Sequence, residues 1–337
     1  MKKTIIIFAL LIIASIGYSQ TSQDYFNMGI EKGKMQDYRG AIADLSEAIE
    51  IDTNFERAYF FRGVRKTQIA DYRGAIIDET KAIKINSNAA DAYWNRGFAK
   101  RMIDDNYGAL EDYNKSIAID SGDATAYYFR GVVKCKINDF IGSIEDCTKS
   151  IEIDPSWADA YSQRGDSKTG LLDFRGAIAD YTKTLEINPN VATGYCNRGI
   201  AKGNIQDRTG AINDFTLAIS IDPMNADAYY NRGITRFKQN DFIKSIADFT
   251  KAIEIIPNSS KAYLGRGYAL NRLQNHNGAI IDFNKAVEIN PKFAEVYYAR
   301  GVIELLLGKK DQGCLDFSKA GELGYTEAYA QIKKFCQ

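Results

Sequence analysis

The sequence contains one histidine, His276, and no excess charge, because 43 basic residues balance 43 acidic residues in a chain of 337. A single histidine leaves little material for Ser-His or Cys-His catalysis and for zinc binding. We therefore expect no catalytic residue, no metal site and no cofactor. A net charge of zero provides no basic surface for phosphates, so we also expect no nucleic acid partner.

Long apolar runs are absent except near the N-terminus. There Lys2 and Lys3 precede the apolar run Ile5–Ile16, and the small residues Gly17 and Ser19 follow it. This order is typical of a secretory signal peptide, which we expect at residues 1–19. A retained membrane anchor is the alternative, but the run is short for a span of about 20 residues. We expect an exported protein, periplasmic or extracellular (including the cell surface), with no stable membrane insertion after cleavage.

Proline is scarce and regularly placed. The five prolines are 34 residues apart, and a glycine recurs at the same spacing over nine copies. With that glycine as position 8, the first copy begins at Ser22 and the array covers residues 22–327. The prolines are Pro155, Pro189, Pro223, Pro257 and Pro291, all at position 32, where proline ends one helix before the next begins.

Each copy carries the pattern of two helices. Position 4 is tyrosine in all nine copies, and positions 4, 7, 8 and 11 share one arc of a helix. Position 16 is usually aspartate, which favours the start of a second helix. These aspartates are Asp37, Asp71, Asp105, Asp139, Asp173, Asp207 and Asp241. We therefore expect nine helix–turn–helix hairpins.

The repeat resembles the tetratricopeptide repeats. The resemblance rests on an aromatic residue at position 4, Gly at 8, Ala or Ser at 20, usually an aromatic at 24, a small residue at 27 and Pro at 32. It implies an all-α, right-handed superhelical solenoid of nine 34-residue repeats, followed by a capping helix at residues 328–337. It also implies that the first helices line a concave groove, usually for a peptide or a partner helix.

Two positions depart from the usual repeat of that family. Position 7 is arginine in eight copies, and position 23 is aspartate in all nine. In an antiparallel hairpin that turns near position 15 these two positions lie side by side. We predict an ion pair in each hairpin, from Arg62–Asp78 to Arg300–Asp316. A lysine at position 11, such as Lys66, should reach the same carboxylate.

Apolar residues on the first helix, at positions 5, 9 and 12, should face away from the second helix of the same hairpin. They are candidate residues of the groove, although packing between neighbouring first helices is the alternative explanation. Copy five, with Ser162, Asp166 and Thr169, forms a polar break. The candidates are Phe60, Trp94, Phe98 and Tyr128 before the break, and Tyr230, Ile234, Phe237, Tyr268 and Tyr298 after it.

The five cysteines lack metal-ligand spacing. Cys314 in the last copy and Cys336 in the final helix are placed so that a disulfide between them could hold the C-terminal end together. The sequence does not decide whether this disulfide forms. We expect Tyr329, Ile332 and Phe335 of the final helix to cover the last hairpin.

The sequence favours an exported, non-catalytic scaffold that binds a protein or peptide in the concave groove. The alternative is an envelope or cell-surface scaffold with a structural or glycan-binding role. An enzyme is disfavoured because the departures from the repeat, Asp166, His276 and Glu304, are scattered along the chain. Nothing in the sequence indicates an oligomeric state.

Overall fold

A computed structural model describes residues 20–336, and all regular elements within that range are α-helices. The expected signal peptide at residues 1–19 lies outside the described residues. No helix in the described part is both long enough and apolar enough to span a membrane. The chain divides into two compact units, of which the first ends at Pro155 and the second begins at Ser156.

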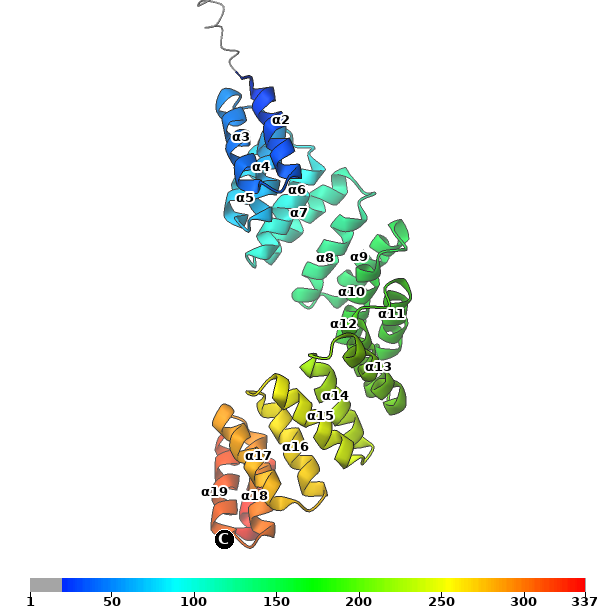
Figure 1. Cartoon of the computed structure of the whole chain (residues 1–337), viewed down its shortest axis with the longest axis vertical. Helices are drawn as coiled ribbons and strands as arrows, with labels where there is room; N and C mark the ends of the chain where they lie inside the picture. The colour runs from blue at the N-terminus through cyan, green and yellow to red at the C-terminus, as the bar shows by residue number, and fades with distance from the viewer. Residues whose placement is uncertain (1–19, 337) are drawn as a thin grey trace, which may run out of the picture. The chain divides into compact units, whose positions relative to one another are not determined.

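The first unit is a stack of four helical hairpins (Figure 1). Each first helix packs on the second helix of its own hairpin and on the first helix of the next one, and each second helix packs on the next first helix. The elements are α2 (Ser22–Lys34) and α3 (Tyr38–Ile51), α4 (Glu56–Gln68) and α5 (Tyr72–Ile85), α6 (Ala90–Met102) and α7 (Asn106–Ile119), and α8 (Ala124–Lys136) and α9 (Phe140–Ile153).

The second unit repeats this arrangement with five hairpins and one further helix. Its elements are α10 (Ala158–Gly170) and α11 (Phe174–Ile187), α12 (Ala192–Asn204) and α13 (Arg208–Ile221), α14 (Ala226–Lys238) and α15 (Phe242–Ile255), α16 (Ser260–Arg272) and α17 (His276–Ile289), α18 (Ala294–Leu306) and α19 (Lys310–Glu322), and α20 (Glu327–Phe335). The fold expected from the repeat, a solenoid of nine hairpins and a final helix, is confirmed.

The turn inside each hairpin has a left-handed residue at position 15. Only the last copy has glycine there, Gly308, at a φ of 75°. The other copies place side chains in this conformation, among them Leu172 at a φ of 62°. The next residue starts the second helix, and the seven predicted aspartate N-caps are confirmed, as in Asp207, whose carboxylate accepts a hydrogen bond from the Gly210 amide at 2.9 Å.

The two helices of a hairpin approach closely because position 8 has no side chain. A Cβ on Gly199 would lie 2.8 Å from the Phe215 ring at position 24, so any larger residue would force the helices apart. Alanines at positions 20 and 27, such as Ala211 and Ala218, are fully buried beside that ring. The glycine, the alanines and the ring together form the core of the sixth hairpin.

The predicted ion pairs are confirmed in all eight hairpins that carry the arginine. In the sixth copy, Arg198 donates to both oxygens of Asp214, at 2.8 and 2.9 Å, and Lys202 reaches the same carboxylate at 2.8 Å. The sequence did not predict two further contacts of this arginine. Its Nη1 donates to Thr182 of the preceding hairpin, and its guanidinium lies over the ring of Tyr195.

The last hairpin is closed by α20 and by a disulfide between Cys314 and Cys336, the bridge that the sequence left open. Ala328 and Ile332 pack on the last hairpin. Tyr329 is 57% exposed but also lies on this hairpin as expected, because its hydroxyl donates to the Gly321 carbonyl of α19 at 3.1 Å. Phe335 is 37% exposed and is not part of the apolar cluster around Phe317. The helix therefore docks through Ala328, Tyr329 and Ile332.

Candidate ligand-binding site

The predicted groove residues lie on the first helices, and three of them contact the large rings at position 24. Three tyrosines show the regular form of this contact, with ring centres 5.7 or 5.8 Å apart. The pairs are Tyr230 with Phe249, Tyr268 with Phe283, and Tyr298 with Phe317. Part of each of these three side chains therefore belongs to the packing of its hairpin, and only the remainder is available to a ligand.

In the first unit, Trp94 and Phe98 form a closed aromatic cluster. Their rings stack at 5.7 Å, and Phe129 of α8 packs edge-on against both. The Arg101 guanidinium lies 4.9 Å from the centre of the Phe98 ring and 5.3 Å from that of Phe129. Since these groups cover one another, the contacts favour packing over ligand binding at this cluster.

The other two candidates of the first unit each contact a ring at position 6. Tyr128 packs edge-on against Phe129, at 4.9 Å. Phe60 packs edge-on against Phe61 and lines a polar pocket of about 470 Å³ with charged neighbours such as Arg57 and Asp91. The position-6 rings, Phe61 and Phe129, were missed by the sequence reasoning because that position is mostly asparagine in other copies.

In the second unit, four of the five candidates line one pocket. Tyr230, Ile234 and Phe237 of α14 face Tyr268 of α16 across a cavity of about 480 Å³, which we call the aromatic pocket. It is completed by residues that the sequence reasoning did not select. These are Lys238, Phe249, Lys261, Leu264, Gly265, Phe293 and Glu295. The fifth candidate, Tyr298, lies instead against Tyr325, and its hydroxyl accepts a hydrogen bond from Gln331 of α20 at 3.3 Å.

Gly265 determines the shape of the aromatic pocket. It occupies position 6, where the preceding copy carries Asn231, and a Cβ added to it would lie 2.6 Å from Cζ of Phe249. The ring of Phe249 therefore uses the space that a side chain at 265 would take. A side chain there would displace the ring into the cavity. This glycine was visible in the sequence as a departure from the repeat.

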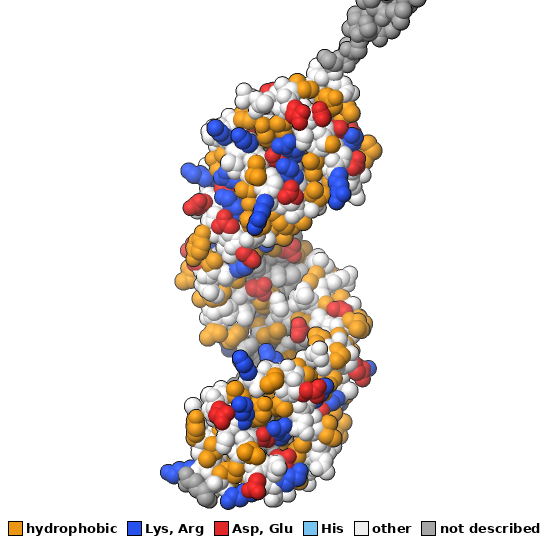
Figure 2. Space-filling view, turned by 90° about the vertical axis from the view of Figure 1, so that its left-hand side faces the viewer, with side chains coloured by type: hydrophobic (Ala, Val, Ile, Leu, Met, Phe, Trp, Pro, Cys, Tyr) orange, Lys and Arg blue, Asp and Glu red, His pale blue; other side chains and the backbone are white. Residues whose placement is uncertain are grey.

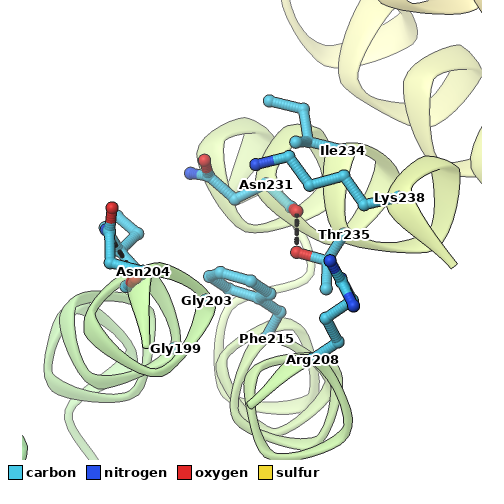
Figure 3. Close-up of a pocket in the computed structure, with 10 residues that line it drawn as sticks. Gly199, Gly203, Asn204, Arg208, Phe215, Asn231, Ile234, Thr235 and Lys238 are labelled. Atoms are coloured by element: carbon cyan, nitrogen blue, oxygen red, sulfur yellow. Dashed lines mark hydrogen bonds between the residues drawn. The ribbon is translucent and has the colours of Figure 1, made fainter. Parts of the chain in front are cut away.

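A second, polar pocket of about 210 Å³ adjoins the first and shares Ile234 and Lys238 with it. Figure 3 shows it between α12, α13 and α14, with Phe215 as its base and Arg208 to one side. Two glycines of α12, Gly199 and Gly203, line the pocket without side chains that would fill it. The other residues that line it are Ile200, Asn204, Asn231 and Thr235.

Charge around the aromatic pocket is mixed. Lys238 and Lys261 contribute two cations, and Glu295 contributes one carboxylate. The hydroxyl of Tyr268 donates to that carboxylate at 3.1 Å. Burial and the nearby Glu295 carboxylate raise the pKa of Tyr268, and the same two causes raise the pKa of Tyr230. Both tyrosines are therefore neutral hydrogen-bonding groups at physiological pH.

The polar break in copy five is a hydrogen-bonded network. Tyr181 donates to Asp166 at 2.7 Å, Asn197 donates to the same oxygen at 3.2 Å, and Thr169 lies 3.2 Å from the tyrosine hydroxyl. Burial raises the pKa of Asp166 above its usual value. The partners of Asp166 within the described chain are internal, so packing accounts for Asp166 and Thr169.

Charged side chains elsewhere are dispersed. On the face drawn in Figure 2, basic and acidic side chains are interspersed with apolar ones. Among residues 20–336, no three His, Cys, Asp or Glu side chains come together as metal ligands would.

Family models match parts of the chain. The model described as "Tetratricopeptide repeat" matches residues 226–259, and one described as "TPR repeat" matches residues 205–240 and 267–308. No curated protein matches the chain in sequence.

Solved structures match a larger share of the chain. A tetratricopeptide repeat protein from Parabacteroides merdae is 18% identical over 74% of this chain and 99% of that one, with a TM-score of 0.58. Cut9–Hcn1, from the APC/C, is 13% identical over 94% of this chain and 76% of that one, with a TM-score of 0.57. YrrB, a "TPR protein with an unusual peptide-binding site", is 27% identical over 55% of this chain and 95% of that one, with a TM-score of 0.49.

Proposed function

Because this chain belongs to the tetratricopeptide-repeat family, we propose that it is a non-catalytic scaffold whose first helices bind a segment of another protein. The aromatic pocket is the observation that carries the proposal. Its volume of about 480 Å³ falls within the range of about 300–1,000 Å³ that is usual for ligand sites. Its walls are mostly aromatic and aliphatic, and such walls suit one large apolar side chain as an anchor.

The site occupies the part of the repeat that the fold leaves free to vary. The aspartate, arginine, glycine and alanine positions build the hairpin, whereas positions 5, 6 and 9 differ between copies. In copies seven and eight those positions are Tyr230, Gly265 and Tyr268, which together shape the cavity. An apolar hollow shaped by residues that vary between copies is better suited to a specific partner than to a general structural role.

The test replaces Gly265 with asparagine, the residue at the same position of the preceding copy. One copy earlier, Phe215 corresponds to Phe249 and Asn231 corresponds to Gly265, so the fold already accommodates an asparagine beside such a ring. The hairpin should therefore tolerate the change while the pocket closes. Short random peptides are displayed on phage and selected on the wild-type protein and on Gly265→Asn. Ile281→Asn, at a side chain of α17 that is 68% exposed and does not line the pocket, is the matched control.

We expect peptides with a large apolar residue to be enriched on the wild type and on Ile281→Asn, and to be lost on Gly265→Asn at an unchanged melting temperature. Enrichment that is equal on Gly265→Asn would remove the aromatic pocket from the proposal. If no peptide is enriched on any variant, while oligosaccharides on a glycan array bind, the protein-binding function is wrong and the glycan-binding alternative replaces it.

We also propose that the protein is exported. The proposal rests on the order of basic, apolar and small residues at 1–19. A Cys314–Cys336 bridge agrees with it, because disulfides persist in oxidising compartments. Cell fractionation with N-terminal sequencing tests it. We expect a mature chain that begins after Ser19 in an envelope or secreted fraction, and a cytoplasmic chain that retains Met1 would contradict export.

A further inference from the structure

Three cations around the two adjoining pockets lack an acidic partner. No carboxylate oxygen of the described residues lies within 4.0 Å of the charged nitrogens of Arg208, Lys238 or Lys261. Neighbouring cations of the same hairpins are paired, as Lys202 is with Asp214 and Arg236 is with Asp248. The pocket cations therefore differ from the ion pairs that hold the hairpins together.

Two of these cations flank the polar pocket. Arg208 is the first residue of α13, and Lys238 is the last residue of α14. Figure 3 shows the lysine side chain extending over the pocket towards Asn231, while the arginine lies on the side of Thr235. No acidic residue lines this pocket. An anion placed there would meet two cations from two different helices.

The polar pocket also offers hydrogen-bond acceptors. The side-chain amide of Asn204 donates to the Ile200 carbonyl, and that of Asn231 donates to the Asp227 carbonyl, each at 2.9 Å. The two amide oxygens accept no hydrogen bond from the described residues. Since a peptide presents backbone N–H groups beside its side chains, acceptors next to cations suit an acidic peptide better than a small free anion.

We propose that the two pockets together hold one peptide segment, with a large apolar side chain in the aromatic pocket and an Asp or Glu side chain between Arg208 and Lys238. The shared lining residues, Ile234 and Lys238, make the pockets continuous, so neighbouring residues of one strand of peptide can occupy both. This inference rests on the proposed function and adds the charge of the ligand to it. Complementary charge lowers the affinity for basic segments more than it raises the affinity for acidic segments.

The test uses fluorescent peptides with acetylated and amidated ends that contain one Phe and differ at one residue two places away. That residue is Glu, Gln or Lys. A fourth peptide carries Gln and a free C-terminal carboxylate, which separates a chain terminus from a side chain as the anion. Fluorescence anisotropy gives Kd for the wild type, Gly265→Asn, the double variant Arg208→Gln/Lys238→Gln, and Arg175→Gln/Lys333→Gln, which removes the same charge away from the pockets.

We expect the wild type to bind the Glu peptide about 3- to 10-fold more tightly than the Gln peptide, and the Lys peptide most weakly. The preference should vanish in Arg208→Gln/Lys238→Gln, with Gln-peptide affinity retained, and should persist in the control double variant. It should also shrink as salt is raised. Equal binding of the Glu and Gln peptides, or a preference that survives in Arg208→Gln/Lys238→Gln, overturns the acidic-ligand inference.

The other outcomes separate this inference from the function on which it rests. If all peptides bind equally to the wild type and all are lost on Gly265→Asn, the pocket binds peptides without charge selection and only this inference fails. If Gly265→Asn binds every peptide as the wild type does, or if no peptide binds the wild type, the proposed function fails as well. Tightest binding of the free-carboxylate peptide overturns the assignment to an acidic side chain.

Discussion

Arg198 and Asp214 form a two-point ion pair between the two helices of the sixth hairpin, with nitrogen–oxygen distances of 2.8 and 2.9 Å. The aspartate is only 2% exposed, and Lys202 reaches its second oxygen. The same arginine also donates to Thr182 of the preceding hairpin, at 3.2 Å. One side chain therefore connects the two helices of its own hairpin to its neighbour, and the contact recurs along the array.

Asp214→Ala should be strongly destabilising. It leaves Arg198 and Lys202 without the carboxylate that offsets the cost of burying them, and breaking a buried pair on one side costs about 3–5 kcal/mol. Urea denaturation followed by circular dichroism measures the loss. Glu186→Ala is the matched control, because Glu186 pairs with Lys183 at the surface, where solvent screens the interaction and the pair contributes little. Equal losses in the two variants would contradict a structural role for the buried pair.

The hairpins, their N-caps and the ion pairs were predictable because each depends on residues at a fixed spacing. The same residue spacing recurs in nine hairpins, so position 7 lies beside position 23 in every copy. The contact from Arg198 to Thr182 was not predictable in this way, because it depends on how one hairpin packs on the next. Contacts within one helical hairpin can thus be predicted from the sequence, whereas contacts between hairpins are harder to predict.

The candidate site was only partly predictable for the same reason. Helical periodicity selects Tyr230, Ile234, Phe237 and Tyr268 for one face, and the structure brings them to one pocket. The cavity itself depends on the absence of a side chain at Gly265 and on the ring of Phe249. Tyr298 has the same periodicity but packs against Tyr325, because the last copy has a following segment that covers it.

Leu172→Gly should stabilise the protein. Leu172 has a φ of 62° and a side chain that is 72% exposed, so it is strained in the turn and contributes little packing. Glycine relieves this conformation, with a gain of about 0.5–1 kcal/mol after its greater freedom in the unfolded chain is counted. Thermal melting measures the change. The adjacent Leu171→Gly, at a φ of −88°, should instead lower the melting temperature, and the same sign for both variants would contradict the argument.

Glu79 should make the stability of the first unit depend on pH. It occupies position 24, is fully buried, and accepts a hydrogen bond from Asn95 through one oxygen, while the other has no hydrogen-bond partner in the described chain. Burial raises its pKa well above the usual value of about 4.3. The folded state therefore binds a proton more tightly than the unfolded state does. The contribution of Glu79 to stability is fully present below that usual value and is lost as pH rises through the folded pKa.

Glu79→Gln tests this relationship, because glutamine keeps the shape and does not titrate. We expect the wild type and the variant to have similar urea midpoints near pH 4, and the variant to be more stable by about 1–3 kcal/mol at pH 7. Glu111→Gln, at an exposed side chain of α7, should leave the pH profile of the wild type unchanged. Parallel pH profiles for wild type and Glu79→Gln would show that the buried carboxyl does not control stability.

The disulfide should hold the C-terminal end closed. Cys314 in α19 and Cys336 after α20 are 22 residues apart in sequence, and closing a loop of that length stabilises a fold by about 2–4 kcal/mol. Cys336→Ser should release α20 from Phe317 and Ala320, which it covers, and expose them to solvent. Hydrogen exchange should then rise in α19 and α20 but stay unchanged in α14–α16.

Reducing agent should reproduce this pattern in the wild type and add nothing in Cys336→Ser, since the remaining described cysteines, Cys135, Cys147 and Cys196, form no disulfide. Loss of exchange protection throughout the second unit would instead assign the bridge a role in folding the whole unit rather than in closing its end.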